Sequence, residues 1–410
     1  MREMKDSGVD WIGEIPHDWE IVQTKRVFRS IKRVVGNQVS EYERLALTLN
    51  GVIKRSKEDN EGLQPEKFEG YQILKENELV FKLIDLENVK TSRVGLSSYT
   101  GLVSPAYIVL TNESKDNRFY YYWFMFMYYN EVFNHLGGDG VRSALNAKDL
   151  TAIPVPFINE CKQHRIADYL DEKCSKIDAI IKKQQTVIEK LKAYKLSKIN
   201  ELIVEVEGQS IHLGYIANMK NGLNFNAVPN GKPLKFLGVG DFKDYFVLDR
   251  EDMFSDILID EEIDEDYMLK DGDIVFVRSN GSKDLVGRAV MVENIDFPLS
   301  YSGFCIRFRN IRTDILNDRY LLYFFRSPYF REQLKKYSQG SNINNINQVL
   351  LSQISITVPS IEIQKRAIDD VERLSYNLDK TILGKQALID KLIAYKKSLI
   401  YEVVTGKKEI

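Results

Sequence analysis

The sequence has very few of the residues that usually hold metals or cross-link small domains. Its 410 residues include three cysteines, Cys161, Cys174 and Cys305, and four histidines. They lie too far apart in the sequence for a zinc cluster or a disulfide framework. The N-terminal residues lack the apolar core of a signal peptide, and no apolar run is long enough to span a membrane. These absences predict a cytoplasmic protein with reduced thiols and no bound metal.

The sequence also lacks a strong charge of either sign. It has 57 Lys and Arg residues against 59 Asp and Glu residues, for a formal net charge of −2. No long-range field therefore attracts the chain to an acidic polymer, and any binding of nucleic acid must depend on local patches. With 44% hydrophobic and 28% charged residues, the composition is that of a globular protein. The length is sufficient for two or three domains.

The common catalytic motifs are absent too. The sequence contains no phosphate-binding loop of the G-x-x-x-x-G-K-[ST] type, no G-x-G-x-x-G at the start of a helix and no H-E-x-x-H pair. One loose pattern is typical of metal-dependent phosphodiesterases: Asp85 and Glu113 would hold Mg²⁺, and Lys115 would orient a water molecule. A stand-alone Mg²⁺-dependent nuclease that uses these three residues therefore stays open as an alternative.

What the sequence does contain is an internal repeat with a separation of 201 residues. Over residues 163–201, 15 of 39 positions are identical to those of 364–402, without a gap. Upstream, residues 118–124 line up more weakly with 319–325 at the same separation, and other matches drift to separations of 195 and 192. This drift indicates loops of different length between shared elements. The chain therefore contains two copies of one unit.

The two well-matched segments predict long helices. In each copy, side chains four and three residues apart form the a/d stripe of a coiled coil. Pro156 and Pro359 precede the segments, and Gly208 and Gly406 follow them, as at helix boundaries. A helix of about 45 residues is about 65 Å long, close to two turns of B-DNA. The apolar positions expected in the coiled-coil spacer are Ile177, Ile181, Ile188, Leu191, Leu202, Leu378, Ile382, Ile389, Leu392, Leu399 and Val403.

Polar residues such as Gln184 and Lys396 interrupt both stripes, so neither helix can be buried deeply alone. The simplest arrangement pairs the two copies, antiparallel if a pseudo-twofold relates them. A plain helical hairpin that only holds two domains together stays open from the periodicity alone.

The remaining sequence predicts two mixed α/β domains. Short strand-like runs such as 79–81 and 274–277 alternate with turns that contain Gly and Asn, and the aromatic stretches 119–129 and 320–330 predict buried helices. We expect an α+β fold with two such domains joined by the antiparallel helices. The predicted boundaries are 1–158 for the first domain, 159–208 for the first spacer helix, 209–358 for the second domain and 359–410 for the second spacer helix.

Basic residues occur among Asn, Ser and Gly in both halves, a combination that contacts phosphates and base edges. Arginine can bind guanine and asparagine can bind adenine through paired hydrogen bonds. For any single residue, a solvated surface position remains the alternative, and the acid-rich stretch 256–273 should face away from phosphate. The candidate DNA contacts are Lys32, Arg33, Lys54, Arg55, Lys57, Arg93, Arg142, Asn146, Lys148, Lys220, Asn224, Asn226, Arg278, Asn280, Lys283, Arg288, Asn342, Asn344 and Asn345.

Together these stretches resemble one known family, the specificity subunits of Type I restriction–modification systems. The opening Asp10-Trp-Ile-Gly-Glu-Ile-Pro-His-Asp-Trp19 is similar to the N-terminal signature of that family. So are Pro154-Val-Pro156, the stretch Gln163-His-Arg-Ile-Ala-Asp-Tyr-Leu170 that follows it, and the two Lys-Leu-x-Ala-Tyr-Lys helices. The resemblance covers the whole chain in order. One departure is Thr357-Val-Pro359, which stands where a second Pro-x-Pro would be expected.

The resemblance implies that each domain reads one half of a split double-stranded DNA site and that the helices fix the gap between the halves. It implies no active site and no cofactor in this chain. The implied partners are two adenine-methyltransferase subunits, which use S-adenosylmethionine, and ATP-dependent endonuclease and translocase subunits, which use ATP and Mg²⁺. No membrane is implied. A coiled-coil adaptor that reads no DNA is the other alternative.

Overall fold

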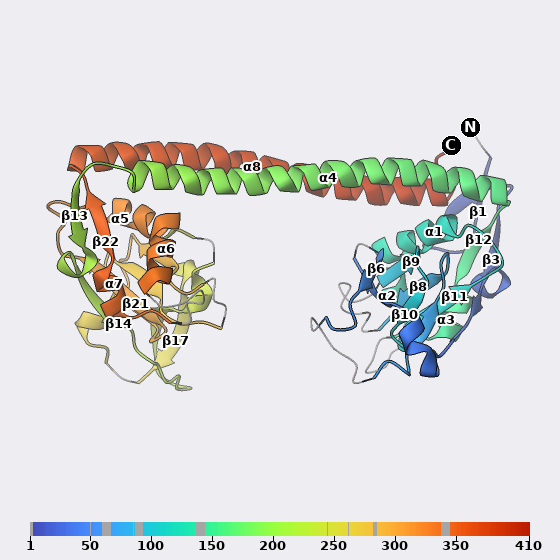
Figure 1. The fold of residues 1–410 in the computed structure, drawn as a ribbon, viewed down its shortest axis with the longest axis horizontal. Helices are drawn as coiled ribbons and strands as arrows, with labels where there is room; N and C mark the ends of the chain where they lie inside the picture. Colours follow the sequence, from blue (N-terminus) through green and yellow to red (C-terminus); the bar gives the residue numbers. More distant parts are fainter. Residues whose placement is uncertain are drawn as a thin grey trace. The chain divides into compact units, whose positions relative to one another are not determined.

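The computed structural model describes residues 3–49, 51–59, 67–84, 86, 93–136, 144–243, 245–260, 262–281, 285–337 and 345–410. The chain divides into two compact units, and both long helices contribute to each (Figure 1). Unit 1 consists of Met1–Gln184 and Ala387–Ile410, and unit 2 of Gln185–Gln386. The predicted boundaries at 158, 208 and 358 separate the globular parts from the long helices. The two units instead share the long helices, with boundaries after Gln184 and Gln386, so the predicted boundaries remain a proposal.

The two matched segments of the repeat form long helices. Helix α4 spans Glu160–Ile203 and helix α8 spans Ile361–Val404, with 44 residues in each. Both begin after a polar cap: the Asn159 side chain accepts the backbone N–H of Lys162 at 2.9 Å, and Ser360 Oγ accepts that of Ile363 at 3.4 Å. Neither helix contains proline, so the hydrogen-bond ladder continues through all turns.

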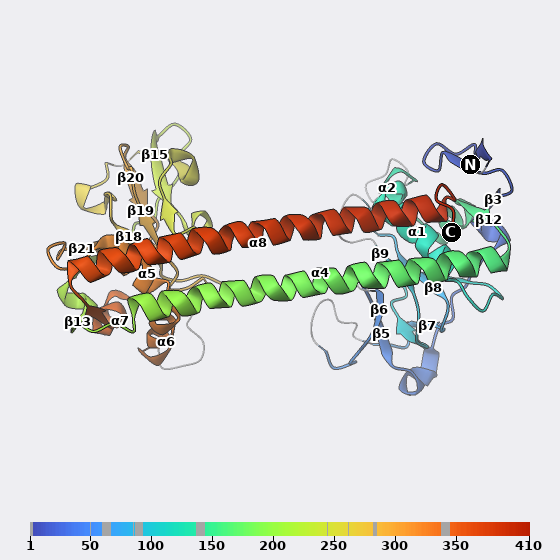
Figure 2. The same ribbon diagram turned by 90° about the horizontal axis from the view of Figure 1, so that it is seen from above.

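Within each unit the two helices run antiparallel. In unit 1 the C-terminal part of α8 lies beside α4 (Figure 2), and Lys396 Nζ pairs with Asp178 at 2.7 Å. In unit 2, Lys195 Nζ pairs with Asp379 at 2.7 Å. The two ion pairs occupy equivalent positions of the repeat, so the same register holds in both units. The predicted fold, with an antiparallel pair of long helices, is confirmed. The most buried spacer positions are Ile177, Ile188, Ile389, Leu399 and Val403.

Unit 1 contains a first set of short strands and helices. They are β1 (Met4–Asp6), β2 (Glu14–Pro16), β3 (Glu20–Gln23), β4 (Arg29–Ser30), β5 (Arg44–Thr48), β6 (Gly51–Arg55), β7 (Gln72–Leu74), β8 (Leu79–Lys82), β9 (Arg93–Leu96), β10 (Gly101–Val103), β11 (Ile108–Thr111), α1 (Arg118–Tyr129), α2 (Val132–Leu136), α3 (Ala147–Ala152) and β12 (Pro154–Phe157). Short 3₁₀ turns lie at Thr24–Arg26 and Gly36–Glu41.

Unit 2 contains a second, similar set. They are β13 (Gln209–His212), β14 (Ala217–Asn221), β15 (Lys232–Leu237), β16 (Val247–Leu248), β17 (Ser255–Ile259), β18 (Ile274–Val277), β19 (Ala289–Val292), β20 (Leu299–Tyr301), β21 (Cys305–Asn310), α5 (Asp318–Phe325), α6 (Pro328–Tyr337), α7 (Gln348–Gln353) and β22 (Ser355–Val358). Short 3₁₀ turns lie at Leu213–Tyr215, Val239–Asp241, Glu251–Met253 and Glu265–Tyr267.

The sheets of the two units share a core strand order, to which unit 2 adds β16 in its first sheet and unit 1 adds β7 in its second. One sheet has the strand order β4-β11-β8-β9 in unit 1 and β14-β21-β18-β19-β16 in unit 2. The second sheet has the order β6-β5-β10-β7 in unit 1 and β17-β15-β20 in unit 2, with a parallel pair in each: β5 with β10, and β15 with β20. A further antiparallel pair precedes each long helix, β3 with β12 and β13 with β22.

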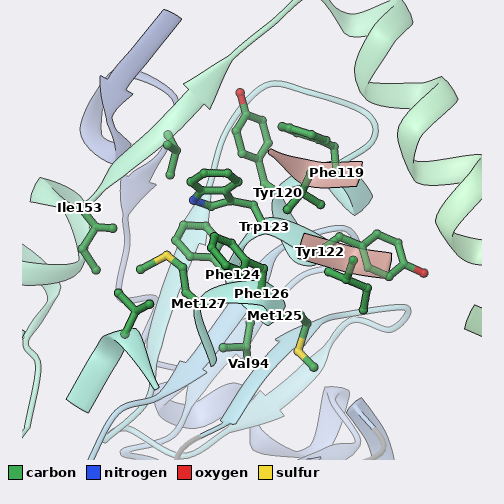
Figure 3. Packing of buried hydrophobic residues seen from close by; sticks show 14 of the residues in the cluster. Val94, Phe119, Tyr120, Tyr122, Trp123, Phe124, Met125, Phe126, Met127 and Ile153 are labelled. Atoms are coloured by element: carbon green, nitrogen blue, oxygen red, sulfur yellow. The ribbon is translucent and has the colours of Figure 1, made fainter. Parts of the chain in front are cut away.

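Helix α1 supplies much of the core of unit 1 because it is apolar on most sides. Eight of its twelve residues are buried, and Figure 3 shows Trp123 and Phe124 packed among them, near Val94 of β9. The same cluster includes Leu170 of α4 and Leu399 of α8. Burying one large apolar side chain contributes about 1.5–3 kcal/mol, so this cluster holds the sheet of unit 1 against the long helices.

Helix α5 has the corresponding role in unit 2. Its six residues Tyr320 to Phe325 are buried and cluster with Phe276 of β18 and Val371 of α8. In Figure 1, α1 and α5 each lie between the strands and the long helices of their own unit. Both aromatic stretches are therefore core elements rather than exposed stacking surfaces. Across the described residues, no helix is long and apolar enough to cross a bilayer.

Candidate nucleic-acid interface

Each globular part is anchored to a long helix by a buried glutamine. In unit 2, Gln364 Nε2 donates to the carbonyls of Pro359 and Ile315 at 2.9 and 2.8 Å, and its Oε1 accepts the backbone N–H of Asn317 at 2.9 Å. In unit 1, Gln163 Nε2 donates to the Ile158 carbonyl at 2.8 Å. Both glutamines are nearly inaccessible. Because their partners are backbone groups, each glutamine fixes the start of its helix against the neighbouring loop.

An arginine and a tyrosine form a second anchor in unit 1. Arg118 Nη1 and the Tyr122 hydroxyl each lie 2.6 Å from a carboxylate oxygen of Asp171 on α4. Arg118 also pairs with Asp116 at 2.6 Å. Burial raises the pKa of Asp116, but hydrogen bonds from Arg118 outweigh it, so this pKa lies below its ordinary value.

The equivalent residues form the same anchor in unit 2. Arg319 Nη1 lies 2.9 Å from Glu372 on α8, and the Tyr323 hydroxyl donates to the same carboxylate at 3.4 Å. Sequence reasoning aligned the arginines and tyrosines through the repeat but did not assign them a function. The acidic partner eight residues after the glutamine was the signal that could have revealed these anchors.

The candidate DNA contacts of the first half are partly occupied by internal partners. Arg33 makes a two-pronged ion pair with Glu78 at 2.8 and 2.7 Å. Lys32 beside it is exposed. Asn146 caps α3, because its side chain accepts the backbone N–H groups of Lys148 and Asp149. The side-chain oxygen of Asn146 therefore has a structural role, while the Lys148 side chain is exposed.

A second basic group lies on strand β6 and the turn after it. Lys54 Nζ pairs with Glu43 at 2.5 Å, and the hydrogen bond that Lys54 donates to that carboxylate is the main reason that the pKa of Lys54 is raised. Arg55 Nε pairs with Asp59 at 2.6 Å. Lys57 Nζ donates to a backbone carbonyl at 2.6 Å. Partly exposed pairs of this kind contribute little stability, so these cations remain capable of exchanging their partners for phosphates. Arg93, on β9, is half-buried.

In the second half, two of the candidate cations face internal partners. Lys220 of β14 pairs with Asp266 and lies 3.6 Å from the centre of the Tyr267 ring. The Asp266 hydrogen bond raises the pKa of Lys220. The Arg288 guanidinium donates to the Lys243 carbonyl. Both cations are therefore held against the protein surface.

Four other candidates come together where β18 ends and β21 begins. Arg278 follows β18, and its guanidinium Nη1 donates to the Gly303 carbonyl at 3.3 Å. A β-bridge joins Ser279 to Asn345. Asn280 directly follows Ser279, so Asn280 and Asn345 both belong to this group. Asn224 contacts Gly303 from the segment after β14. Asn226 follows on that segment and is exposed. Arg142, Lys283, Asn342 and Asn344 lie outside the described residues.

The nuclease pattern has no assembled site in the part of the chain that the structure describes. Glu113 and Lys115 are exposed in the turn before α1, and Asp85 lies outside the described residues. Among those described, no group of three or more His, Cys, Asp or Glu side chains is arranged to hold a metal ion.

The repeat coincides with two matches to one protein family. A family model described as "Type I restriction modification DNA specificity domain" matches residues 16–190 and again residues 213–390. A chain from a structure of complex assembly and conformational transition in the type I R-M system has a similar fold, with a TM-score of 0.70 over 95% of this chain and 98% of that chain. It is 13% identical, so the likeness concerns the fold alone.

Two curated proteins are similar over a shorter stretch. The specificity subunit of the Type I restriction enzyme StySPI from Salmonella potsdam is 26% identical over 144 residues, 35% of this chain and 30% of that protein. The specificity subunit of EcoKI from Escherichia coli is 26% identical over 145 residues, 35% of this chain and 31% of that protein. Each match spans less than a third of the relative's length.

Proposed function

The chain belongs to the Type I restriction modification DNA specificity family, and from this premise we propose that it reads a split target in double-stranded DNA, one half-site per globular domain. The duplication carries this proposal. Each copy has two sheets with a shared core strand order, a buried glutamine anchor and an arginine–tyrosine anchor to its long helix. A duplicated binding domain on a helical spacer is suited to two sequences at a fixed separation.

The charge distribution supports contact with DNA through local patches. The chain is nearly neutral, and several of its cations are paired internally, so binding by the isolated chain would be weak and dependent on salt. Arg278, Asn224 and Asn345 lie on one group of segments in unit 2, and these residue types can discriminate between bases. Partner subunits would supply the remaining phosphate contacts.

Methyltransferase subunits would bind along the exposed faces of α4 and α8. Tyr194 and Tyr395, which are equivalent in the repeat, are 48% and 54% exposed, and Tyr376 and Leu383 are 69% and 70% exposed. Large exposed apolar side chains on a helix are typical of protein interfaces. In this proposal the chain is not catalytic and holds no cofactor. S-adenosylmethionine belongs to two adenine-methyltransferase partners, and ATP and Mg²⁺ belong to endonuclease and translocase subunits.

An adenine-methylation map of the source genome, with and without this gene, tests the proposal. We expect deletion of the gene to remove methylation at one split motif and plasmid-borne wild-type chain to restore it. An unchanged map would contradict the proposal and favour an adaptor that reads no DNA. Mg²⁺-dependent cleavage of DNA by the purified chain, abolished by Glu113→Gln, would instead favour the nuclease that uses Asp85, Glu113 and Lys115.

A further inference from the structure

A tightly built corner of unit 2 presents one exposed aromatic side chain. Phe304 is the residue directly before β21, and its side chain is 58% exposed. Its backbone is held on both sides: the carbonyl accepts the N–H of Arg278 at 2.7 Å, and its own N–H donates to Ser302 Oγ at 3.3 Å. An exposed ring on a fixed backbone loses little conformational freedom when it binds a partner.

Two glycines allow the segments of this corner to lie in contact. A Cβ at Gly222 would overlap the carbonyl oxygens of Tyr301 and Ser302, and a Cβ at Gly303 would overlap the Asn224 side chain. The Gly303 N–H donates to the Leu223 carbonyl at 2.7 Å. The segment after β14 and the turn before β21 therefore form one rigid surface that carries Phe304 and Asn224.

The described segments that form the corner around Phe304 carry arginine and amides. Residues 221–226, 278–281, 302–304 and 345–347 include no Asp or Glu. The Arg278 Nε is buried without a hydrogen-bond partner. One carboxylate, Asp260, lines the adjoining cavity of about 220 Å³ next to Asn224 and Asn226, so part of the acid-rich stretch 256–273 borders this corner.

The equivalent corner of unit 1 has different chemistry. Phe81 pairs with Ile108 in unit 1 as Phe276 pairs with Ile306 in unit 2. Two residues beyond these pairs, unit 1 has Leu83 and Ala106 where unit 2 has Arg278 and Phe304. The backbone is nevertheless the same, because the Leu83 carbonyl accepts the N–H of Leu145 at 3.1 Å as the Arg278 carbonyl accepts that of Ile346 at 2.9 Å.

We propose that this corner of unit 2 is its base-reading surface, with Phe304 against the base edges of the half-site and with Arg278 and Asn224 beside it as hydrogen-bond donors. The proposal rests on the proposed function. Phenylalanine contacts the thymine methyl group or enters between base steps. Arginine and asparagine favour guanine and adenine respectively. A framework shared by both units, with different side chains at one corner, is what two readers of different sequences require.

Strand β21 supplies a matched control for this proposal. Ile311 directly follows the strand as Phe304 directly precedes it, and it is also 58% exposed. Seven residues of extended chain separate the two by about 23 Å. Ile311 lies near the end of the sheet that Gln364 anchors to α8 through Ile315 and Asn317. Truncating Ile311 therefore removes a similar apolar side chain from the opposite end of the same strand.

The test is adenine-methylation mapping in cells that carry wild-type chain, Phe304→Ala, Phe304→Tyr or Ile311→Ala at equal protein levels. We expect Phe304→Ala to reduce discrimination at one or more positions of a single half-site by about tenfold. The other half-site and the gap should not change, and Phe304→Tyr and Ile311→Ala should behave like wild type. Complete loss of methylation in Phe304→Ala, with recovery in Phe304→Tyr, would also support the proposal.

Two results would overturn the inference while the proposed function stands. One is an unchanged motif in Phe304→Ala. The other is an equal loss of methylation in Phe304→Ala and Ile311→Ala, which indicates general destabilisation. If deletion of the whole gene leaves the methylation map unchanged, both the proposed function and this inference fail.

Discussion

Gln163 and Gln364 are the residues at which each globular part is fixed to its helix. A buried amide that bonds to backbone groups is costly to remove, because each backbone partner is left without a hydrogen bond in a site that water does not reach. Gln364 satisfies three such groups, whereas Gln163 satisfies the Ile158 carbonyl and reaches the Tyr120 hydroxyl at 3.5 Å. The two anchors should therefore differ in strength.

We expect Gln364→Ala to lower the free energy of unfolding by about 2–4 kcal/mol and Gln163→Ala by about 1–2 kcal/mol. Urea unfolding of both variants measures the difference. Gln185→Ala is the control, because Gln185 is exposed on α4 and its loss should change stability by less than about 0.5 kcal/mol. Equal effects for all three substitutions would refute the role of the buried amides.

At the residue scale the sequence predicted which positions are equivalent in the two copies of the repeat. It did not predict which cations are free of internal partners and so available to bind DNA. The repeat aligned Arg118 with Arg319 because both copies keep the same spacing to the glutamine. It could not reveal that Arg33 pairs with Glu78 or Lys220 with Asp266, since those partners come from distant segments of the chain. Phe304 was missed because a single exposed aromatic residue leaves no periodic signal.

The helices α4 and α8 were predictable as elements because their stripe extends over many turns. A period of three and four residues sustained over 44 residues cannot come from a strand. The strands are short, and their partners are not encoded locally. The parallel pairing of β5 with β10 and of β15 with β20 depends on long connections. Hydrophobic runs predicted β8 and β18 without their order, and they did not reveal these four strands.

The Lys396–Asp178 ion pair reports the register of the two helices in unit 1. We expect Lys396→Asp to destabilise the protein by about 1 kcal/mol, because two carboxylates then face each other, and the double variant Lys396→Asp/Asp178→Lys to recover most of that loss. Denaturant unfolding of the single and double variants provides the double-mutant cycle.

The control for this cycle is Lys176→Asp. Lys176 pairs with Glu172 four residues earlier on the same helix at 2.5 Å, so its reversal perturbs one helix without facing the other. A coupling energy near zero between Lys396 and Asp178 would show that this contact does not set the register.

The whole molecule uses both helices twice, once in each unit. Each long helix takes part in both the Lys195–Asp379 and the Lys396–Asp178 ion pairs. Segments of equal length inserted after Tyr194 and after Tyr395 lie between these two ion pairs on each helix. Both ion pairs are therefore kept. Inserting seven residues in both helices also preserves the heptad stripe. The added length is about 10 Å.

With this paired insertion, we expect the gap between the two half-sites to grow by about three base pairs, at about 3.4 Å each, while both half-sites stay the same. Methylation mapping reads the gap directly. A seven-residue insertion at Gly8, in the turn between β1 and β2 where an added Cβ would meet no other atom within 4 Å, is the control and should leave the gap unchanged. An unchanged gap with the paired insertion would contradict the role of the helices as a spacer.

The two units also differ in the order in which the ribosome supplies their residues. Unit 2 is one continuous stretch, whereas the core of unit 1 includes Leu399 and Val403, and Lys407 Nζ donates to the Ile12 carbonyl. The ring of Phe126 in α1 packs against that of Tyr401, with 5.2 Å between the ring centres. This contact cannot form until residues 185–386 have been synthesised. The half that is translated first is therefore completed last, and its aromatic helix is the surface that a nascent chain must keep from aggregating until α8 has been made.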